Sequence, residues 1–250
     1  MTGAGLFRFV VLALLVALVV WPQAFAPIFA PFAPEGGPVI YDRTPLLSLA
    51  LGHLALVAIA CGLATLVAVL LAILVTRPGG AEFQPLSRAI ANIGQTFPPV
   101  AVLALTVPVL GFGSGPTLVA LFLYGLLPIF ENAMTAFATT PPKVLEAARG
   151  MGFTPAQRLR RVELPLALPL ILTGIRLSAV ISLGTATIGS TVAARTLGEV
   201  IIAGLLTSNT AFVLQGGLIV GLFAGLLYDG LVLLERSVAR HSAPLGEHNA

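Results

Sequence analysis

The chain has 250 residues, of which 57% are hydrophobic and only 9% are charged. Ordinary soluble domains carry about 25% charged residues, so a soluble globule and a disordered chain are both excluded. The apolar residues occur in long runs rather than in short alternating segments, which favours membrane helices over a membrane β-barrel. The net charge of +3 belongs to no soluble basic domain, so nucleic-acid binding is not expected. The sequence therefore predicts an all-α polytopic membrane protein.

Six apolar segments are long enough to cross a bilayer, for which about 20 residues are needed. In chain order they cover residues 9–25, 46–75, 89–110, 117–137, 166–188 and 211–234. Prolines after the first segment end its helix and predict an outer loop over residues 27–45. We expect one transmembrane helix within residues 1–26, a transmembrane core over residues 46–235 with a polar loop at 140–164, and a polar tail over residues 236–250.

The positive charges predict the orientation of these segments. If both termini face the cytoplasm, ten lysine and arginine residues lie inside, and only Arg43 and Arg195 lie outside. This asymmetry makes the loop at 27–45 periplasmic and supports an even number of spans. As an alternative, the first segment is a cleaved signal peptide, because Ala24 and Ala26 have small-x-small spacing. A proline directly after that site hinders cleavage, which favours retention of the segment.

The loop over residues 140–164 has the local signals of two short helices joined at an elbow. Thr140 and Pro141 predict the start of the first helix, and the glycine-containing segment that follows ends it. Thr154 and Gln157 have the spacing of a capping box and predict the start of the second helix. Neither helix has enough apolar surface to be stable alone, so we expect this elbow to dock on a partner.

The same loop resembles the EAA motif of ABC importer permeases, which reads Glu-Ala-Ala, three residues, Gly, nine residues, Ile, one residue and Leu-Pro. With valine for isoleucine as the only departure, the chain has this spacing in Glu146, Ala147, Ala148, Gly152, Val162, Leu164 and Pro165. The resemblance implies a type I ABC importer, or MetI-like, permease fold with about six transmembrane helices in a bacterial-type plasma membrane. It also implies that these seven residues couple the chain to an ATPase, with the glycine allowing the sharp turn between the helices.

The resemblance further implies a set of partners. They are a cytoplasmic ABC ATPase dimer that binds ATP and Mg²⁺, a second permease chain, an extracytoplasmic substrate-binding protein and membrane lipid. No G-x-x-x-x-G-K-[ST] sequence occurs in the chain, so the energy for transport must come from the ATPase partner. We expect no cofactor and no metal in this chain, and no enzymatic activity of its own.

Segments between residues 45 and 235 resemble the osmoprotectant branch of these permeases, which imports glycine betaine, choline or carnitine. The similar segments are NIGQTFP, GFGSGP, LPI, ARGMGFTP and GTAT. Glu131 stands where the branch usually has a basic residue, and residues 193–198 stand where it usually has Gly-Ala-Gly-Gly-Leu-Gly. The alternatives are a permease for another small solute, of the amino acid, phosphonate or sulfonate type, and an ion-coupled secondary transporter.

Polar residues within the predicted spans are candidates for the transport pathway or its gates, because polar groups in hydrocarbon are costly. Near Pro98 a predicted helix break frees backbone carbonyls, which often line a cavity. The full set of candidates is Gln95, Thr96, Pro98, Glu131, Arg176, Thr185, Thr187 and Asp229. Structural pairing and close helix packing are the alternative roles. From their similar depths in the membrane, we expect Arg176 to pair with Asp229 or Glu131, within the chain or across a dimer of permease chains.

Overall fold

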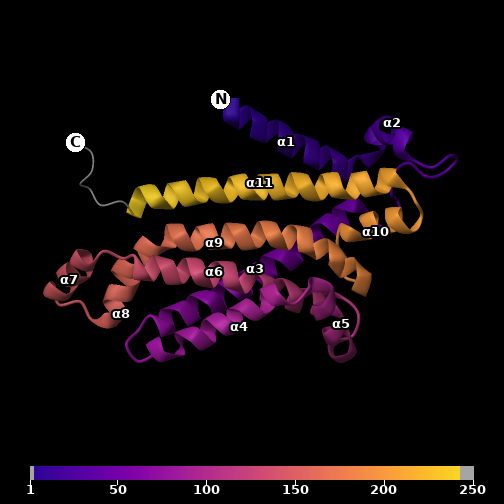
Figure 1. The fold of residues 1–250 in the computed structure, drawn as a ribbon. Helices are drawn as coiled ribbons and strands as arrows, with labels where there is room; N and C mark the ends of the chain where they lie inside the picture. The colour runs from indigo at the N-terminus through magenta and orange to yellow at the C-terminus, as the bar shows by residue number, and fades with distance from the viewer. Residues whose placement is uncertain (1–2, 243–250) are drawn as a thin grey trace.

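The computed structural model describes residues 3–242, and every regular element in that range is helical. The long helices run side by side, with α7 and α8 at one end of the bundle and α2, α5 and α10 at the other (Figure 1). The predicted all-α class is confirmed.

Four helical runs in the described part of the chain are long and apolar enough to cross a membrane. The first is α3 (Leu46–Val75), which covers the predicted segment, and the second is α6 (Ser114–Ala138). The third is a continuous run whose main part is α9 (Leu164–Thr185). The fourth is α11 (Thr210–Ser242), whose helix extends into the predicted polar tail.

Two further spans are bent rather than straight. The helix α1 (Gly3–Val20) is followed at an angle of 106° by helical turns, namely η1 (Pro22–Phe25), α2 (Ala26–Phe29) and η2 (Ala30–Phe32). After η3 (Ala81–Phe83), the helices α4 (Gln84–Thr96) and α5 (Pro99–Leu110) meet at 97°. If each bent pair counts as one span, the described residues have six spans, as predicted.

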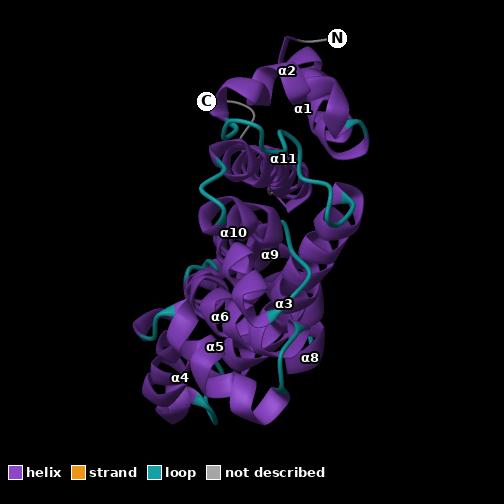
Figure 2. Ribbon diagram, turned by 90° about the vertical axis from the view of Figure 1, so that its right-hand side faces the viewer, coloured by secondary structure: helices purple, strands orange, loops and turns teal. Residues whose placement is uncertain are grey.

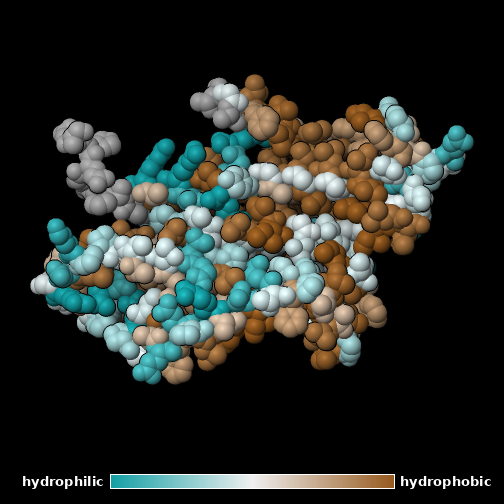
Figure 3. Space-filling view, in the orientation of Figure 1, coloured by the Kyte–Doolittle hydropathy of each residue, from teal (hydrophilic) through white to brown (hydrophobic). Residues whose placement is uncertain are grey.

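The short elements lie between the spans. At one end of the bundle are α7 (Pro142–Gly150), α8 (Pro155–Arg158) and the π-helical turn η4 (Leu159–Glu163). At the other end are η5 (Ala186–Val192) and α10 (Gly198–Leu206). Figure 3 shows hydrophilic residues gathered over the α7–α8 end, whereas hydrophobic residues dominate over α1.

The centre of the bundle is formed by α3, α6 and α9, which pack closely against one another. On α3 a stripe of small residues at helical spacing, Ala64, Ala68 and Ala72, is fully buried. Gly125 of α6 lies over this stripe, where an added Cβ would come within 3.4 Å of the Ala64 Cβ. Small residues let membrane helices approach closely, so this stripe explains the packing of the central helices.

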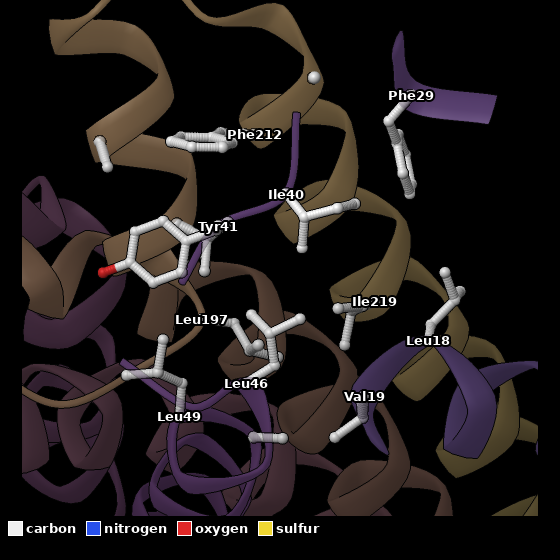
Figure 4. Close-up of a cluster of buried hydrophobic side chains, with 14 of the residues drawn as sticks. Leu18, Val19, Phe29, Ile40, Tyr41, Leu46, Leu49, Leu197, Phe212 and Ile219 are labelled. Atoms are coloured by element: carbon white, nitrogen blue, oxygen red, sulfur yellow. The ribbon is translucent and has the colours of Figure 1, made fainter. Parts of the chain in front are cut away.

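The helices α11 and α1 form an outer layer, with α11 between α1 and α9 in both views (Figures 1 and 2). A second hydrophobic cluster joins this layer to α3 near the α10 end (Figure 4). There, Leu18 of α1, Leu46 of α3 and Ile219 of α11 are all at most 3% exposed, as is Leu197, directly before α10. The segment between α2 and α3 is therefore held against the bundle, with Ile40 and Tyr41 inside the cluster.

Two expectations about local structure need correction, and a third is confirmed. The first helix ends at Val20, not at residue 25, and the proline-rich segment after it contains short helices because proline is tolerated in a first helical turn. The break predicted near Pro98, within the span over residues 89–110, is confirmed, because Pro98 and Pro99 have no N–H to continue the hydrogen bonds of α4. Thr140 does not cap α7, since its hydroxyl donates to the Ala136 carbonyl at 3.2 Å.

Candidate functional site

The predicted elbow is formed by α7, the turn at residues 151–154 and α8. Gly152 has a left-handed backbone with φ of 75°, which reverses the chain after α7. The Phe153 N–H then donates to the Ala148 carbonyl at 3.1 Å and closes the end of α7. Thr154 and Gln157 form the predicted capping box, with hydrogen bonds of 2.8 and 3.3 Å. The local geometry of the elbow thus follows from its own sequence.

The elbow presents some EAA residues outward and buries others. Glu146, Ala147 and Gly152 are exposed, and so is Met151, whose side chain is 66% exposed. Ala148 is buried and anchors α7 to the rest of the chain. Further along, Val162 and Leu164 are half-buried and Pro165 is exposed at the start of α9. The outward group is the part of the motif that is free to contact another protein.

A buried carboxylate lies inside the motif, at a position for which the motif specifies no residue. Glu163 is only 5% exposed and forms two ion pairs, with Arg77 at 2.5 Å and with Arg158 at 2.7 Å. The Arg77 guanidinium also lies 5.9 Å from the centroid of the Phe137 ring. Sequence reasoning missed this cluster; its only sequence signal is an acidic residue between arginines and the start of a span.

The break between α4 and α5 is tied to a second break in α6. Pro128 within α6 has no N–H, which leaves the Tyr124 carbonyl without its helical donor. The Gln95 side chain donates to that carbonyl at 2.8 Å, and the Tyr124 hydroxyl donates to the freed Phe97 carbonyl at 2.6 Å. Gln95, Thr96 and Pro98 are all exposed there. The structure therefore brings three of the pathway candidates together on one open face.

Glu131 lies on α6 and pairs with α4, not with Arg176. Its carboxylate accepts two hydrogen bonds from Arg88, at 2.6 and 3.1 Å, in a bidentate arrangement. The two side chains are 38% and 51% exposed, so this pair is on the surface of the single chain. Arg88 was not among the predicted pathway residues; the available signal was a basic residue two turns before Gln95, on the same face of α4.

Thr185 and Thr187 lie where α9 gives way to η5. Their hydroxyls donate to carbonyls of the same helical run, of Ile181 at 3.0 Å and of Gly184 at 2.7 Å. The backbone of Thr187 also lies under the start of α10, where a Cβ added to Gly198 would come within 1.8 Å of the Thr187 carbonyl oxygen. In this conformation both threonines thus have structural hydrogen bonds.

Within the chain, the expected pair of Arg176 with Asp229 or Glu131 does not form. Arg176 forms an ion pair with Glu235 at 3.4 Å, and its guanidinium lies 4.8 Å from the centroid of the Tyr228 ring. Asp229 instead pairs with Arg8 of α1. The helices α9 and α11 do pack together as expected, but Asp229 is on the side of α11 that faces α1.

A polar cluster that sequence reasoning missed holds the segment before α3 at the α10 end. Glu199 of α10 accepts hydrogen bonds from the Tyr41 hydroxyl at 2.5 Å and from the Thr44 hydroxyl at 2.7 Å. Burial and the neighbouring Glu199 carboxylate raise the pKa of Tyr41 to about 12, so its hydroxyl is a donor at neutral pH. The Asn209 side chain also donates to the Pro38 carbonyl at 2.7 Å.

Known proteins similar to this chain are membrane or permease components of transport systems. Residues 64–240 match the family described as binding-protein-dependent transport system inner membrane component. Osmoprotectant import permease protein OsmY of Salmonella typhimurium is 36% identical over 233 residues, which cover 93% of this chain and 94% of the relative. Choline transport system permease protein OpuBB of Bacillus subtilis is 37% identical over 180 residues, which cover 70% of this chain and 83% of that protein.

Solved structures show the same fold. An inward-facing conformation of the MetNI methionine ABC transporter matches with a TM-score of 0.67 at 23% identity, over 79% of this chain and 99% of the matched chain. Another crystal form of that transporter matches with a TM-score of 0.65 at 25% identity, over 75% of this chain and 93% of the matched chain. The chain thus has the MetI-like permease fold, and it belongs to the family of binding-protein-dependent transport system inner membrane components.

Proposed function

We propose that the chain is the permease subunit of an ATP-driven importer of compatible solutes with a quaternary ammonium group, such as glycine betaine, choline or carnitine. The relatives that support this substrate class are named for osmoprotectants and for choline, and one of them aligns along nearly its whole length. The chain itself supplies the membrane path and hydrolyses no ATP.

The observation that carries this proposal is the exposed elbow. Its outward residues, Glu146, Ala147 and Met151, project from the end of the bundle where hydrophilic residues gather (Figure 3). Small side chains at such a site allow the backbone of a partner to approach closely. We assign this surface to a cytoplasmic ABC ATPase dimer, which binds the ATP and Mg²⁺. The α7–α8 end and both termini then face the cytoplasm, in a bacterial-type plasma membrane surrounded by lipid.

One chain with six spans forms half of a pathway, so a second permease chain, identical or homologous, completes it. The face that carries Gln95, Thr96 and the Arg88–Glu131 pair is open in the single chain and is the part we assign to the pathway. Closure of the ATPase dimer would move the elbows and switch the cavity between outward and inward access.

Substrate selection is assigned mainly to an extracytoplasmic binding protein. Recognition of a quaternary ammonium commonly uses a cage of aromatic side chains. In this chain the Tyr41 ring packs edge-on against Phe212, the Tyr124 hydroxyl closes the α4–α5 break, and Tyr228 faces Arg176. The three tyrosines thus have separate structural tasks on different elements, which supports discrimination before the solute reaches the permease.

The test is uptake of radiolabelled glycine betaine, choline and carnitine by vesicles that contain this permease, its ATPase and its binding protein. We expect the uptake to require ATP and to persist after the ion gradients are collapsed. Unlabelled methionine should not inhibit this uptake. Uptake driven by an ion gradient without ATP would contradict the ATP-driven mechanism. Uptake of methionine in place of the quaternary amines would contradict the substrate class.

A further inference from the structure

The elbow is covalently continuous with two of the three central helices, but not with the third. It follows α6 in the chain and leads through η4 into α9. The helix α3 is the remaining central helix, and it ends before residue 77, far from the elbow in sequence. A movement of the elbow therefore reaches α6 and α9 through the backbone, whereas α3 must be reached through side chains.

Arg77 is the residue that makes this connection. It directly follows the last turn of α3, where the Arg77 N–H donates to the Leu74 carbonyl at 3.3 Å. Its guanidinium donates to Glu163 at 2.5 Å and lies against the Phe137 ring at the end of α6. The ends of α3, α6 and α9 that lie nearest the elbow thus meet at the Arg77 side chain.

Glu163 joins this convergence point to the elbow. Its second oxygen accepts from the Arg158 side chain at 2.7 Å, and Arg158 is the last residue of α8. The π-helical turn between them has a wider spacing than an α-helix, and such turns often mark functional positions. Within that turn Arg160 and Arg161 are exposed, whereas Glu163 is buried. The turn therefore directs its one carboxylate toward the bundle and two of its basic side chains toward the surface.

We infer that Glu163, held between Arg77 and Arg158, is the joint that transmits movement of the α7–α8 elbow to α3. A buried carboxylate with two guanidinium partners resists separation, because pulling either guanidinium away removes part of the compensation for burying the Glu163 charge. The central helices pack through the buried alanine stripe of α3, so a displacement at Arg77 moves α3 as a rigid element. This inference deepens the proposed function and rests on the docking of an ATPase at the elbow.

The test distinguishes the Arg77–Glu163 ion pair, which reaches α3, from the Arg158–Glu163 ion pair, which lies within the loop. Arg77→Gln removes the link to α3 but leaves Arg158 to neutralise Glu163, so the loop keeps its charge balance. The matched control is Glu82→Gln, an exposed carboxylate in the neighbouring turn η3. The assembled importer with its ATPase and binding protein is placed in vesicles, and ATP hydrolysis and glycine betaine uptake are measured on the same preparation.

We expect Arg77→Gln to keep ATP hydrolysis near the wild-type rate and to lower uptake per ATP by about tenfold or more, in the range of ordinary coupling energies. Arg77→Lys, which keeps the charge, should restore most of the ratio, and Glu82→Gln should not change it. A wild-type ratio in Arg77→Gln would overturn the inference. So would a parallel loss of hydrolysis and uptake at unchanged ratio, because that is the result of a purely structural role.

A second readout needs no knowledge of the solute. A cysteine placed at Leu74, an exposed residue near the inner end of α3, is labelled with a maleimide in the Cys61→Ser background, with and without ATP. ATP should change the labelling rate when Arg77 is present and not in Arg77→Gln. If wild-type vesicles take up no quaternary ammonium, the substrate proposal fails while this labelling still judges the joint. If Arg77→Gln does not assemble, Glu163→Asp replaces it, and unchanged coupling there overturns the inference equally.

Discussion

At the helix breaks caused by proline, single polar side chains donate hydrogen bonds to the backbone carbonyls that lack a helical donor. Gln95 donates to the Tyr124 carbonyl that Pro128 leaves free, and the Tyr124 hydroxyl donates to the Phe97 carbonyl at the α4–α5 break. Free backbone carbonyls are costly in hydrocarbon, so these bonds stabilise both bends. A polar residue within a span of this protein therefore often has a structural partner, and its polarity alone does not make it part of the pathway.

Ala193 is strained in a way that predicts a stabilising substitution. Its φ is 63°, in the left-handed region that favours glycine, and it is exposed between η5 and α10. We expect Ala193→Gly to raise the free energy of unfolding by about 0.5–1 kcal/mol. The substitution removes the cost of a left-handed backbone for alanine, roughly 1–2 kcal/mol, but glycine loses more conformational entropy on folding, and the figure is the difference. Thermal unfolding of the purified chain in detergent measures it.

The control for this prediction is Ala89→Gly, an exposed alanine in the right-handed helix α4. There the same substitution should lower the free energy of unfolding by roughly 0.5–1 kcal/mol. If both substitutions lower stability equally, the backbone of Ala193 is not strained.

Which residue contacts could be predicted depends on how local they are. The Thr154–Gln157 capping box and the turn at Gly152 were predictable, because each depends on neighbours in the chain. The pair of Arg77 with Glu163 spans 86 positions, and no local signal specifies it. The expected Arg176–Asp229 pair does not form within the chain, because depth in the membrane does not give angular position. Glu235 lies nearly two helical turns from Tyr228 and shares its face, whereas Asp229 is turned by about 100°.

At the scale of elements, the close approach of α4 to α6 holds the helix before the α4–α5 break against α6. Gly94 lies directly against α6, and a Cβ added to it would come within 2.0 Å of the Leu123 carbonyl oxygen. Gly94→Ala should therefore push the two helices apart and lower the free energy of unfolding by about 1–3 kcal/mol. Gly217→Ala on α11, where an added Cβ meets nothing within 4 Å, is the control. Equal stability of the two variants in thermal unfolding would contradict this packing.

The elbow between α7 and α8 depends on the backbone of Gly152 rather than on the space around it. Its φ is 75°, and an added Cβ would meet nothing within 4 Å. Gly152→Val should abolish most uptake without preventing membrane insertion, because the strain of roughly 1–3 kcal/mol falls on the turn alone. Gly152→Asn should retain part of the activity, since asparagine tolerates the left-handed region. Uptake assays normalised to the inserted protein test this, and full activity of Gly152→Val would show that the turn is not needed for coupling.

The elements themselves were largely predictable, and so was the break near Pro98, whereas the bend after α1 was not. A long apolar run predicts a span whether or not the helix is straight, so α3 matches its predicted segment while residues 89–110 divide into two helices. The paired prolines at 98 and 99 were the available signal for that division. For residues 27–45, the prolines indicated only that α1 ends. This segment is held in place by burial against α10 and α11, and such tertiary contacts cannot be predicted from local sequence.

At the scale of the whole molecule, the charges and the helix ends agree on one polarity. The elbow, the end of α3 that is followed by Arg77 and the end of α11 lie toward the same end of the bundle, and hydrophilic residues gather there (Figures 1 and 3). The opposite end carries α10 and the Tyr41–Glu199 contact. If the first end is cytoplasmic, an ATPase meets the elbow and a binding protein meets the α10 end.

The most direct measurement of this account is site-specific photo-cross-linking in the assembled importer. A photoreactive residue replaces either Met151 at the elbow, 66% exposed, or Leu206 at the end of α10, 82% exposed. We predict that the residue at position 151 cross-links to the ATPase subunit and that the residue at position 206 does not. Cross-linking of the ATPase at position 206, or its absence at position 151 in a complex that hydrolyses ATP, would contradict the docking of the ATPase at this elbow.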